Sequence, residues 1–308
     1  MRLCENRPLF LSIPSRMRPS QSQYLSIRGL RYHIRTWGDA AAPKLFMLHG
    51  WMDVSASFQF LVDALQRDWH VLAPDWRGYG LTEWPQDGYW FADYIGDLDA
   101  LLTALSPDGP ADIVGHSLGG NVAGMYAGLR PHRVRSLVSL EGFGIPSGVD
   151  LQAPGQLLKW LDGLVDPPTL RPYANLSEAA DRLQKTNPRL RRDRAEFLAQ
   201  HWAEVLPDGT ARLRADPKHR LPFPSVSRSG EWIATWRQVT APVLWVVANE
   251  SHIKRWAAPN DEEWERRKAA FRTLRLESVS EAAHMLHHDQ PEVVAGLIEG
   301  FVDYRGES

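Results

Sequence analysis

The stretch ADIVGHSLGGNVAGMYAGL, residues 111–129, decides the fold. Its first four residues form a short apolar run typical of a buried strand, and residues 120–129 have the small and apolar side chains of a packed helix. Between them, Gly115-His116-Ser117-Leu118-Gly119 fits the pattern G-x-S-x-G. A serine at such a strand-to-helix turn has a strained backbone and an exposed Oγ above the helix N-terminus. Ser117 is therefore the candidate nucleophile.

Strands and helices alternate on both sides of this motif. The sequence predicts a hairpin over residues 24–34, strands at 44–48, 70–73, 135–140, 241–248 and 273–279, and helices at 56–65, 91–105 and 291–302. This alternation is typical of an α/β fold. We expect a mostly parallel sheet with helices on both faces.

The rhythm changes in the middle of the chain. Residues 143–238 are rich in proline, tryptophan and arginine, and helical segments are predicted at 155–165, 176–186 and 191–205. We expect a helical cap, or lid, at 143–238, inserted into a core made of residues 23–142 and 239–308. Residues 1–22 are expected to be a poorly ordered leader, since their apolar run is too short for a signal peptide; either Met1 or Met17 fits as the natural start.

Composition narrows the class of protein. The chain has 308 residues, a net charge of −2 and 44% hydrophobic residues, which indicates a globular protein and favours neither nucleic acid nor an anionic membrane as a partner. No apolar stretch is long enough for membrane insertion. The single cysteine, Cys4, excludes an intramolecular disulfide and fits a cytoplasmic location. The oligomeric state is left open.

A histidine-rich loop precedes the last helix. His284 comes first after the strand at 273–279, where the loop can direct it at Ser117, so we assign it as the general base. His287 and His288 lie nearer the helix and are expected at the surface or as capping groups. No metal is expected, because the histidine spacing lacks a matching ligand cluster elsewhere.

The segment His49-Gly50-Trp51 follows the strand at 44–48 directly. A backbone N–H in this loop can converge with the N–H of the residue after the serine on one developing oxyanion. The predicted donors are the amides of Trp51 and Leu118.

Two glutamates are candidates for the acid that orients the histidine. Glu141 follows the strand at 135–140 in an apolar context, and Glu250 follows the strand at 241–248 in a polar loop. A carboxylate at either point can accept the imidazole Nδ1–H. We favour Glu141, since a buried charge requires a partner, and keep Glu250 as the alternative.

Together these motifs resemble the α/β-hydrolase superfamily over residues 24–304. The resemblance rests on the segments 49–51, 75–80 (DWRGYG), 115–120, 242–244 and His284 ahead of Pro291-Glu292. Members usually carry an aspartate after the strand at 241–248, and Ser251 occupies that place here. Some relatives, notably certain haloalkane dehalogenases, carry the acid after the preceding core strand, which strengthens Glu141. Residues 183–188 are similar to the lid of the serine-hydrolase-like subgroup.

The resemblance implies a serine hydrolase that cleaves a small or medium carboxylic ester through an acyl-enzyme on Ser117. It implies no cofactor and only a small-molecule substrate as partner. The residues expected to line the substrate pocket are His49, His116, Phe143, Trp160 and Met285. Two alternatives stay open: a C–C bond hydrolase of ring-cleavage products with the same triad, and a cofactor-free oxygenase or slow-turnover ligand-binding member of the same fold.

Overall fold

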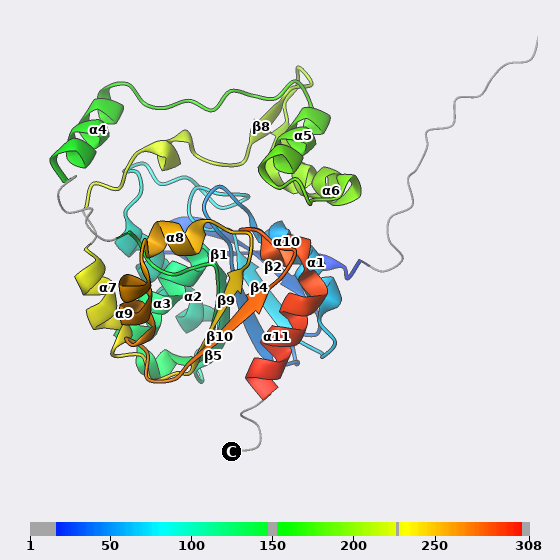
Figure 1. Ribbon diagram of the computed structural model, residues 1–308. Coiled ribbons are helices and arrows are strands. Elements are labelled where there is room, and N and C mark those ends of the chain that lie inside the picture. The colour runs from blue at the N-terminus through cyan, green and yellow to red at the C-terminus, as the bar shows by residue number, and fades with distance from the viewer. Residues whose placement is uncertain (1–16, 147–152, 226–227, 304–308) are drawn as a thin grey trace, which may run out of the picture.

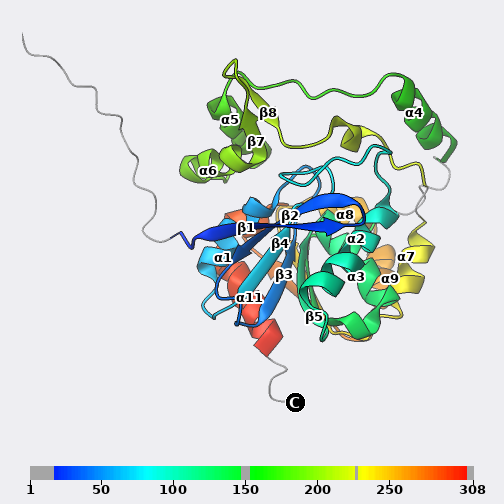
Figure 2. The same ribbon diagram turned by 180° about the vertical axis from the view of Figure 1, so that it is seen from behind.

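An eight-stranded sheet forms the centre of the molecule in a computed structural model that describes residues 17–146, 153–225 and 228–303 (Figures 1 and 2). The strand order is β1-β2-β4-β3-β5-β6-β9-β10. The strands are β1 Ser20–Ile27, β2 Leu30–Trp37, β3 Lys44–Leu48, β4 His70–Pro74, β5 Ala111–His116, β6 Val134–Leu140, β9 Val243–Ala248 and β10 Leu274–Val279. All neighbouring pairs from β4 to β10 are parallel, and β1 and β2 are antiparallel. The mostly parallel α/β sheet predicted from the sequence is confirmed.

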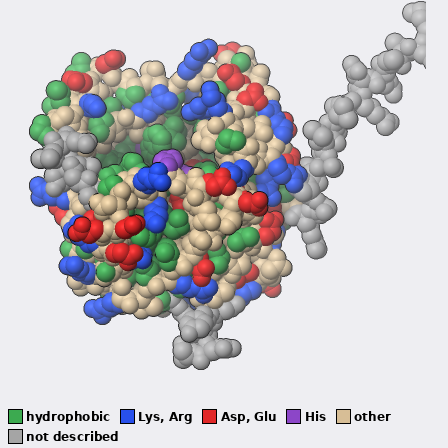
Figure 3. Space-filling view, in the orientation of Figure 1, with side chains coloured by type: hydrophobic (Ala, Val, Ile, Leu, Met, Phe, Trp, Pro, Cys, Tyr) green, Lys and Arg blue, Asp and Glu red, His purple; other side chains and the backbone are tan. Residues whose placement is uncertain are grey.

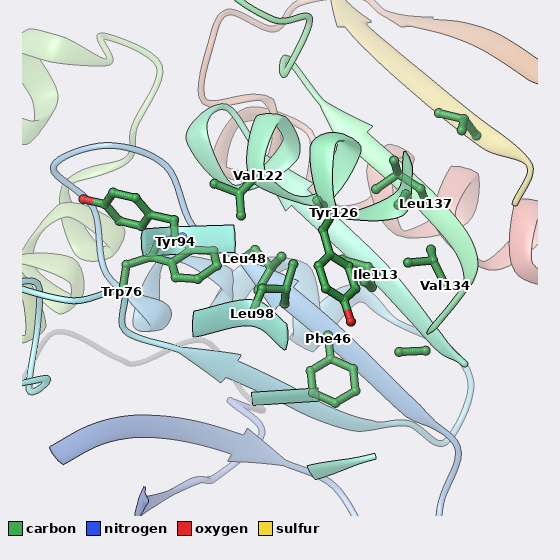
Figure 4. Close-up of a cluster of buried hydrophobic side chains, with 14 of the residues drawn as sticks. Phe46, Leu48, Trp76, Tyr94, Leu98, Ile113, Val122, Tyr126, Val134 and Leu137 are labelled. Carbon is green, nitrogen blue, oxygen red and sulfur yellow. The ribbon is translucent and has the colours of Figure 1, made fainter. Parts of the chain in front are cut away.

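The sheet is buried on both faces, because successive side chains of each strand point to opposite sides. Along β3, Phe46 and Leu48 join one apolar cluster, while Leu45 and Met47 join the other. Figure 4 shows Phe46 and Leu48 within the first cluster, which side chains from neighbouring strands and helices complete. Burial on both faces explains why the strands read as continuous apolar runs.

Helices cover both faces, as predicted. Helices α2 and α3 supply residues to the cluster that holds Phe46, and α1 and α11 supply residues to the cluster that holds Leu45. The core helices are α1 Gln59–Ala64, α2 Phe91–Leu105, α3 Leu118–Leu129, α7 Ser229–Trp236, α8 Ile253–Ala257, α9 Asp261–Lys268, α10 Leu286–Asp289 and α11 Pro291–Asp303. Single 3₁₀ turns lie at Ser55–Phe58, Pro131–Arg133 and Pro217–Arg220. None of the helices within the described ranges combines the length and apolar content needed to cross a bilayer.

The first hairpin extends further than the sequence predicted. Its two-residue turn is Arg28-Gly29, with φ of 45° and 84°, the left-handed pair that matches the twist of the flanking strands. β1 begins at Ser20, inside the segment expected to be the leader. Just before it, the Arg18 N–H donates to Asp63 Oδ1 at 2.7 Å. Residues 1–16 of the expected leader lie outside the described residues.

Residues 153–225, which are called the cap from here on, form the helices α4 Ala153–Val165, α5 Leu176–Thr186 and α6 Arg192–Trp202, and the short strands β7 Ala203–Val205 and β8 Ala211–Leu213. α5 and α6 lie over the carboxyl ends of the parallel strands, on the side of the sheet where α8 and α10 also lie (Figure 1). The predicted helix at 191–205 ends early because residues 203–205 pair with β8. α7 falls inside the predicted cap range, but its Trp232 and Trp236 pack into the core cluster of α2 and α3.

Buried ion pairs fix the loop that follows β4. Arg77 donates from Nε and Nη2 to the two carboxylate oxygens of Asp97 on α2, each at 2.6 Å. The Asp75 carboxylate accepts the Ser55 N–H at 2.6 Å and lies 2.7 Å from Nδ1 of His33. Burial acts to raise the pKa of Asp75, but these hydrogen bonds outweigh it and hold the pKa well below its ordinary value. The DWRGYG segment therefore has a structural role.

Close backbone contact sets the position of the G-x-S-x-G turn. A Cβ added to Gly119 would lie 2.1 Å from the Leu48 carbonyl oxygen, and one added to Gly115 would lie 2.5 Å from the Gly119 carbonyl carbon. Only glycine permits β3, β5 and α3 to approach this closely.

We expect Gly119→Ala to destabilise the protein by about 3 kcal/mol, because the added methyl group must push β3 away from α3. Gly296→Ala is the matched control, since Gly296 lies on α11 with nothing within 4 Å of an added Cβ. The control should stabilise the protein by about 0.5–1 kcal/mol through helix propensity. Urea unfolding of both variants measures the difference; equal stabilities would contradict the close-contact explanation.

Candidate active site

Ser117 lies at the turn between β5 and α3. Its φ of 51° and ψ of −112° place a non-glycine residue in a strained conformation. The Ser117 N–H donates to the carbonyl of Leu140 at 2.8 Å, which ties the turn to the end of β6. This is the backbone geometry of a nucleophile elbow, with Oγ above the N-terminus of α3.

His284 reaches Ser117 from the loop between β10 and α10. Its Nε2 lies 3.1 Å from the Ser117 Oγ, within the range for proton transfer. His116 holds this loop, because its Nε2 donates to the carbonyl of His284 at 2.8 Å. Burial lowers the pKa of His116 well below its ordinary value, so His116 is a neutral hydrogen-bond donor.

Glu141 lies directly behind His284. It follows β6 with φ of 58° and is 1% exposed, and its Oε2 lies 3.5 Å from the His284 Nδ1. The Ala248 N–H donates to the other carboxylate oxygen at 2.8 Å. The Ser251 hydroxyl donates to Oε2, so the serine found at the usual aspartate place supports the glutamate.

Glu250 does not approach the histidine. Its side chain is about half exposed and forms an ion pair with Arg189 of the cap. The structure thus places Ser117, His284 and Glu141 in one chain of contacts and leaves Glu250 outside it.

The two amides predicted to bind the oxyanion lie in loops that leave adjacent strands. Leu48 and Gly115 are paired in the parallel register of β3 and β5, so the loops after them run side by side. Leu118 is the first residue of α3, and its N–H has no acceptor within the helix. The Trp51 indole donates to the His219 carbonyl at 3.2 Å and so contacts the cap. Oxyanion binding by both amides stays a prediction.

A cavity of about 350 Å³ opens above Ser117 and His284, between the core loops and the cap. Figure 3 shows this side of the molecule hollowed, with hydrophobic side chains in the hollow and a histidine at its floor. Most of the lining is apolar, and the residues are Gly50, Trp51, Met52, Asp53, Val54, His116, Ser117, Tyr173, Arg182, Leu183, Thr186, Asn187, Leu190, Leu198, Trp202, Leu213, Arg220, His284, Met285 and His288. A cavity of this size suits a compact small molecule.

Two of the five predicted pocket residues, His116 and Met285, line this cavity, and three do not. His49 is fully buried, and its Nε2 accepts the Trp76 N–H at 2.9 Å. Phe143 packs in the core against two tryptophans. Trp160 lies on α4 against Trp90 and lines a separate, smaller cavity. These three assignments are corrected, because strand and helix packing direct the side chains away from Ser117.

His287 and His288 are buried, which corrects the expectation that they lie at the surface. α10 packs against the 3₁₀ turn Ser55–Phe58, so both rings reach the hydroxyl of Ser57, at 3.1 and 2.7 Å. The sequence did not predict this burial, because α10 has only one turn. A helix this short has no repeating pattern of apolar residues from which a buried face can be identified.

A buried polar cluster lies beneath His284. Atoms of Asp53, His116 and His287 that can bind a metal lie within 4.8 Å of one another. Among the described residues, Asp53 Oδ2 and the Nδ1 atoms of both histidines have no hydrogen-bond partner. Burial raises the pKa of Asp53 to about 7, and the protonated carboxyl is a donor that suits a neutral imidazole nitrogen. Sequence reasoning missed this cluster because the residues come from three separate segments, the loop after β3, the end of β5 and helix α10.

The comparisons with known proteins define the class. Residues 43–291 match the family described as the alpha/beta hydrolase fold, and the chain belongs to this family. It is similar to a serine hydrolase-like protein of Danio rerio, with 28% identity over 284 residues, which cover 87% of this chain and 84% of that protein. The family and this relative identify the chain as an α/β-fold hydrolase.

Two solved structures share the fold. The thioesterase domain from the curacin biosynthetic pathway has a TM-score of 0.80 at 22% identity, covering 91% of this chain and 99% of that one. E-2-(acetamidomethylene)succinate hydrolase has a TM-score of 0.74 at 24% identity, covering 92% and 100%. At these identities the likeness concerns the fold alone.

We expect Glu141→Gln to lower kcat by a factor on the order of 10³ to 10⁴, because the amide keeps the shape but cannot stabilise an imidazolium at His284. Glu250→Gln is the matched control and should stay within about tenfold, ~1.4 kcal/mol. Both variants are assayed on one ester at saturating concentration. A greater loss in Glu250→Gln would place the acid after β9 instead.

Asp53→Asn should change how stability depends on pH. Since the folded pKa of about 7 lies above the ordinary value, the folded state loses stability as pH rises through the window from about 4 to 7. The neutral amide removes this loss, which is ~1.4 kcal/mol per pKa unit. Urea unfolding at pH 5 and pH 8 measures it: the stability advantage of Asp53→Asn over the wild type should be larger at pH 8. A constant difference would mean that Asp53 is ionised throughout.

Proposed function

We propose that the chain is a serine hydrolase that cleaves a small or medium acyl compound, most simply a carboxylic ester, through an acyl-enzyme on Ser117. One observation carries the proposal: the contacts from Ser117 Oγ to His284 Nε2, and from His284 Nδ1 to Glu141, at the floor of the largely apolar cavity. A nucleophile, a base and an orienting carboxylate are the three parts that acyl transfer requires.

The proposed reaction has two halves. Ser117 Oγ attacks the ester carbonyl while His284 takes its proton, and Glu141 stabilises the imidazolium. The amides of Trp51 and Leu118 bind the oxyanion, and His284 then protonates the leaving alcohol. Water, activated by the same histidine, attacks the acyl-serine and releases the acid. Glu141 is suited to its part because it is buried and held by Ala248 and Ser251.

The comparisons support acyl chemistry without naming a substrate. The zebrafish relative is called serine hydrolase-like, and one structural neighbour is a thioesterase domain. A thioester carbonyl is attacked in the same way as an ester carbonyl, so both belong to the proposed substrate class. A C–C hydrolase with the same triad differs only in its leaving group, and a panel of substrates separates the two.

We expect Ser117→Ala to remove most of the esterase activity, with a loss on the order of 10⁴ to 10⁶ in kcat, because one oxygen is deleted and the fold is kept. Ser278→Ala, an exposed serine on β10, is the control and should behave as the wild type. The assay uses p-nitrophenyl esters of graded acyl length beside a vinylogous 1,5-diketone, the C–C substrate.

A fluorophosphonate probe should label the wild type once, at Ser117, and should not label the alanine variant. His284→Ala should be as damaging as Ser117→Ala, with the double variant little worse, because the two residues act as a unit. Retained turnover in Ser117→Ala, together with oxygen consumption on a quinolone-type substrate, would favour the oxygenase. A single acylation without turnover would favour a ligand-binding protein.

A further inference from the structure

We propose that the acyl group of the substrate carries a carboxylate at its far end, which binds Arg182 and Arg220 on the cap side of the cavity. This rests on the proposed function, since it names the substrate class of the same site. The two arginines come from different parts of the cap, Arg182 from α5 and Arg220 from the 3₁₀ turn Pro217–Arg220.

The charges that line the cavity are unbalanced. Arg182 and Arg220 both line it, and among the described residues of the lining Asp53 alone has an acidic side chain. Asp53 lies in the loop after β3, and burial raises its pKa to about 7, so it is partly protonated at neutral pH. The cavity therefore favours an anionic ligand.

Most other arginines of the cap are already paired. Arg189, Arg191 and Arg192 form ion pairs with Glu250, Asp193 and Asp181, and Arg212 and Arg214 both pair with Glu204. No carboxylate among the described residues lies within ion-pair distance of Arg182 or Arg220.

The groups beside the two arginines are neutral. Arg220 donates to the Thr169 carbonyl at 3.3 Å, and Arg182 lies near the phenol of Tyr173. Both cations lower the pKa of that phenol, against the larger effect of burial, which raises it. Glu178, one turn before Arg182 on α5, accepts the Ala174 N–H instead. Both guanidinium groups thus lie near one phenol, and no carboxylate among the described residues neutralises their positive charge. This charge is available to bind an anionic ligand.

The order of groups across the cavity defines the shape of the substrate. Ser117 and His284 belong to the core loops, while both arginines belong to the cap that lies over them (Figures 1 and 3). The cap also lines the cavity with Leu183, Leu190, Leu198 and Leu213. Methylene groups suit the leucines, and a carboxylate matches the planar fork of a guanidinium. An ester or thioester of a short dicarboxylic acid has these groups in this order.

The test compares two substrates with equal acyl length, the mono-p-nitrophenyl ester of adipic acid and p-nitrophenyl hexanoate. We expect the wild type to prefer the adipate ester by about tenfold in kcat/KM at low salt, with the preference carried by KM and reduced by added salt. The double variant Arg182→Gln/Arg220→Gln should lose this preference. Arg191→Gln removes the same kind of charge from a paired cap arginine and should keep it. Preference for hexanoate in the wild type, or retained preference in the double variant, would overturn the inference.

A binding measurement tests the carboxylate site independently of the proposed hydrolysis reaction. In Ser117→Ala, calorimetry with monomethyl adipate and methyl hexanoate measures recognition without turnover. We expect the adipate ligand to bind about tenfold more tightly, and this difference to disappear when both arginines are also replaced. Arginine-dependent binding without hydrolysis of either ester by the wild type would overturn the proposed function alone. Equal binding of the two ligands to Ser117→Ala would overturn the carboxylate site alone.

Discussion

The close approach of β3, β5 and α3 determines where every candidate reacting group lies. A methyl group at Gly119 would stand 2.1 Å from the Leu48 carbonyl, so the helix can begin against the sheet only where side chains are absent. The turn that results holds Ser117 at a φ of 51°. The loop after β3 starts beside this turn, because Leu48 and Gly115 are paired in register. Strain at the serine is therefore a consequence of strand and helix packing.

The position of the Glu141 carboxylate depends on two strands, β6 and β9. Glu141 leaves β6 with a left-handed backbone, a conformation that costs about 1–3 kcal/mol. The N–H of Ala248, at the end of β9, and the hydroxyl of Ser251, in the loop after β9, both donate to the Glu141 carboxylate and hold it behind His284. Their hydrogen bonds to a buried charge offset the strain. A serine after β9 thus positions a carboxylate that starts on β6.

The reacting groups and most of the apolar lining of the cavity come from different parts of the chain. Core loops hold Ser117, His284 and Glu141, while the cap supplies the leucines and arginines that line the opposite side of the cavity. The cap contacts the core through many polar bonds, among them the Trp51 indole to the His219 carbonyl and the Asn187 amide to Asp289, and neither of these bonds involves a reacting group. Changes in the cap can therefore alter substrate choice while the reacting groups stay in place.

The sequence alone predicted a mostly parallel sheet, the strands that form it, and Ser117 and His284 as residues brought into contact, because these follow from local patterns: apolar runs, glycines at a turn, and a histidine after the last strand. It did not predict the order of the strands in the sheet or the short helices α8, α9 and α10. It favoured Glu141 over Glu250 from the polarity of a few neighbours, and the structure shows one beside His284 and the other paired with Arg189. Tertiary structure decided what lies around them. His49 and Phe143 follow core strands, as site residues do, yet packing turns both inward. Burial of His287 and the gathering of Arg182 with Arg220 depend on contacts between segments far apart in the chain, which no local pattern encodes.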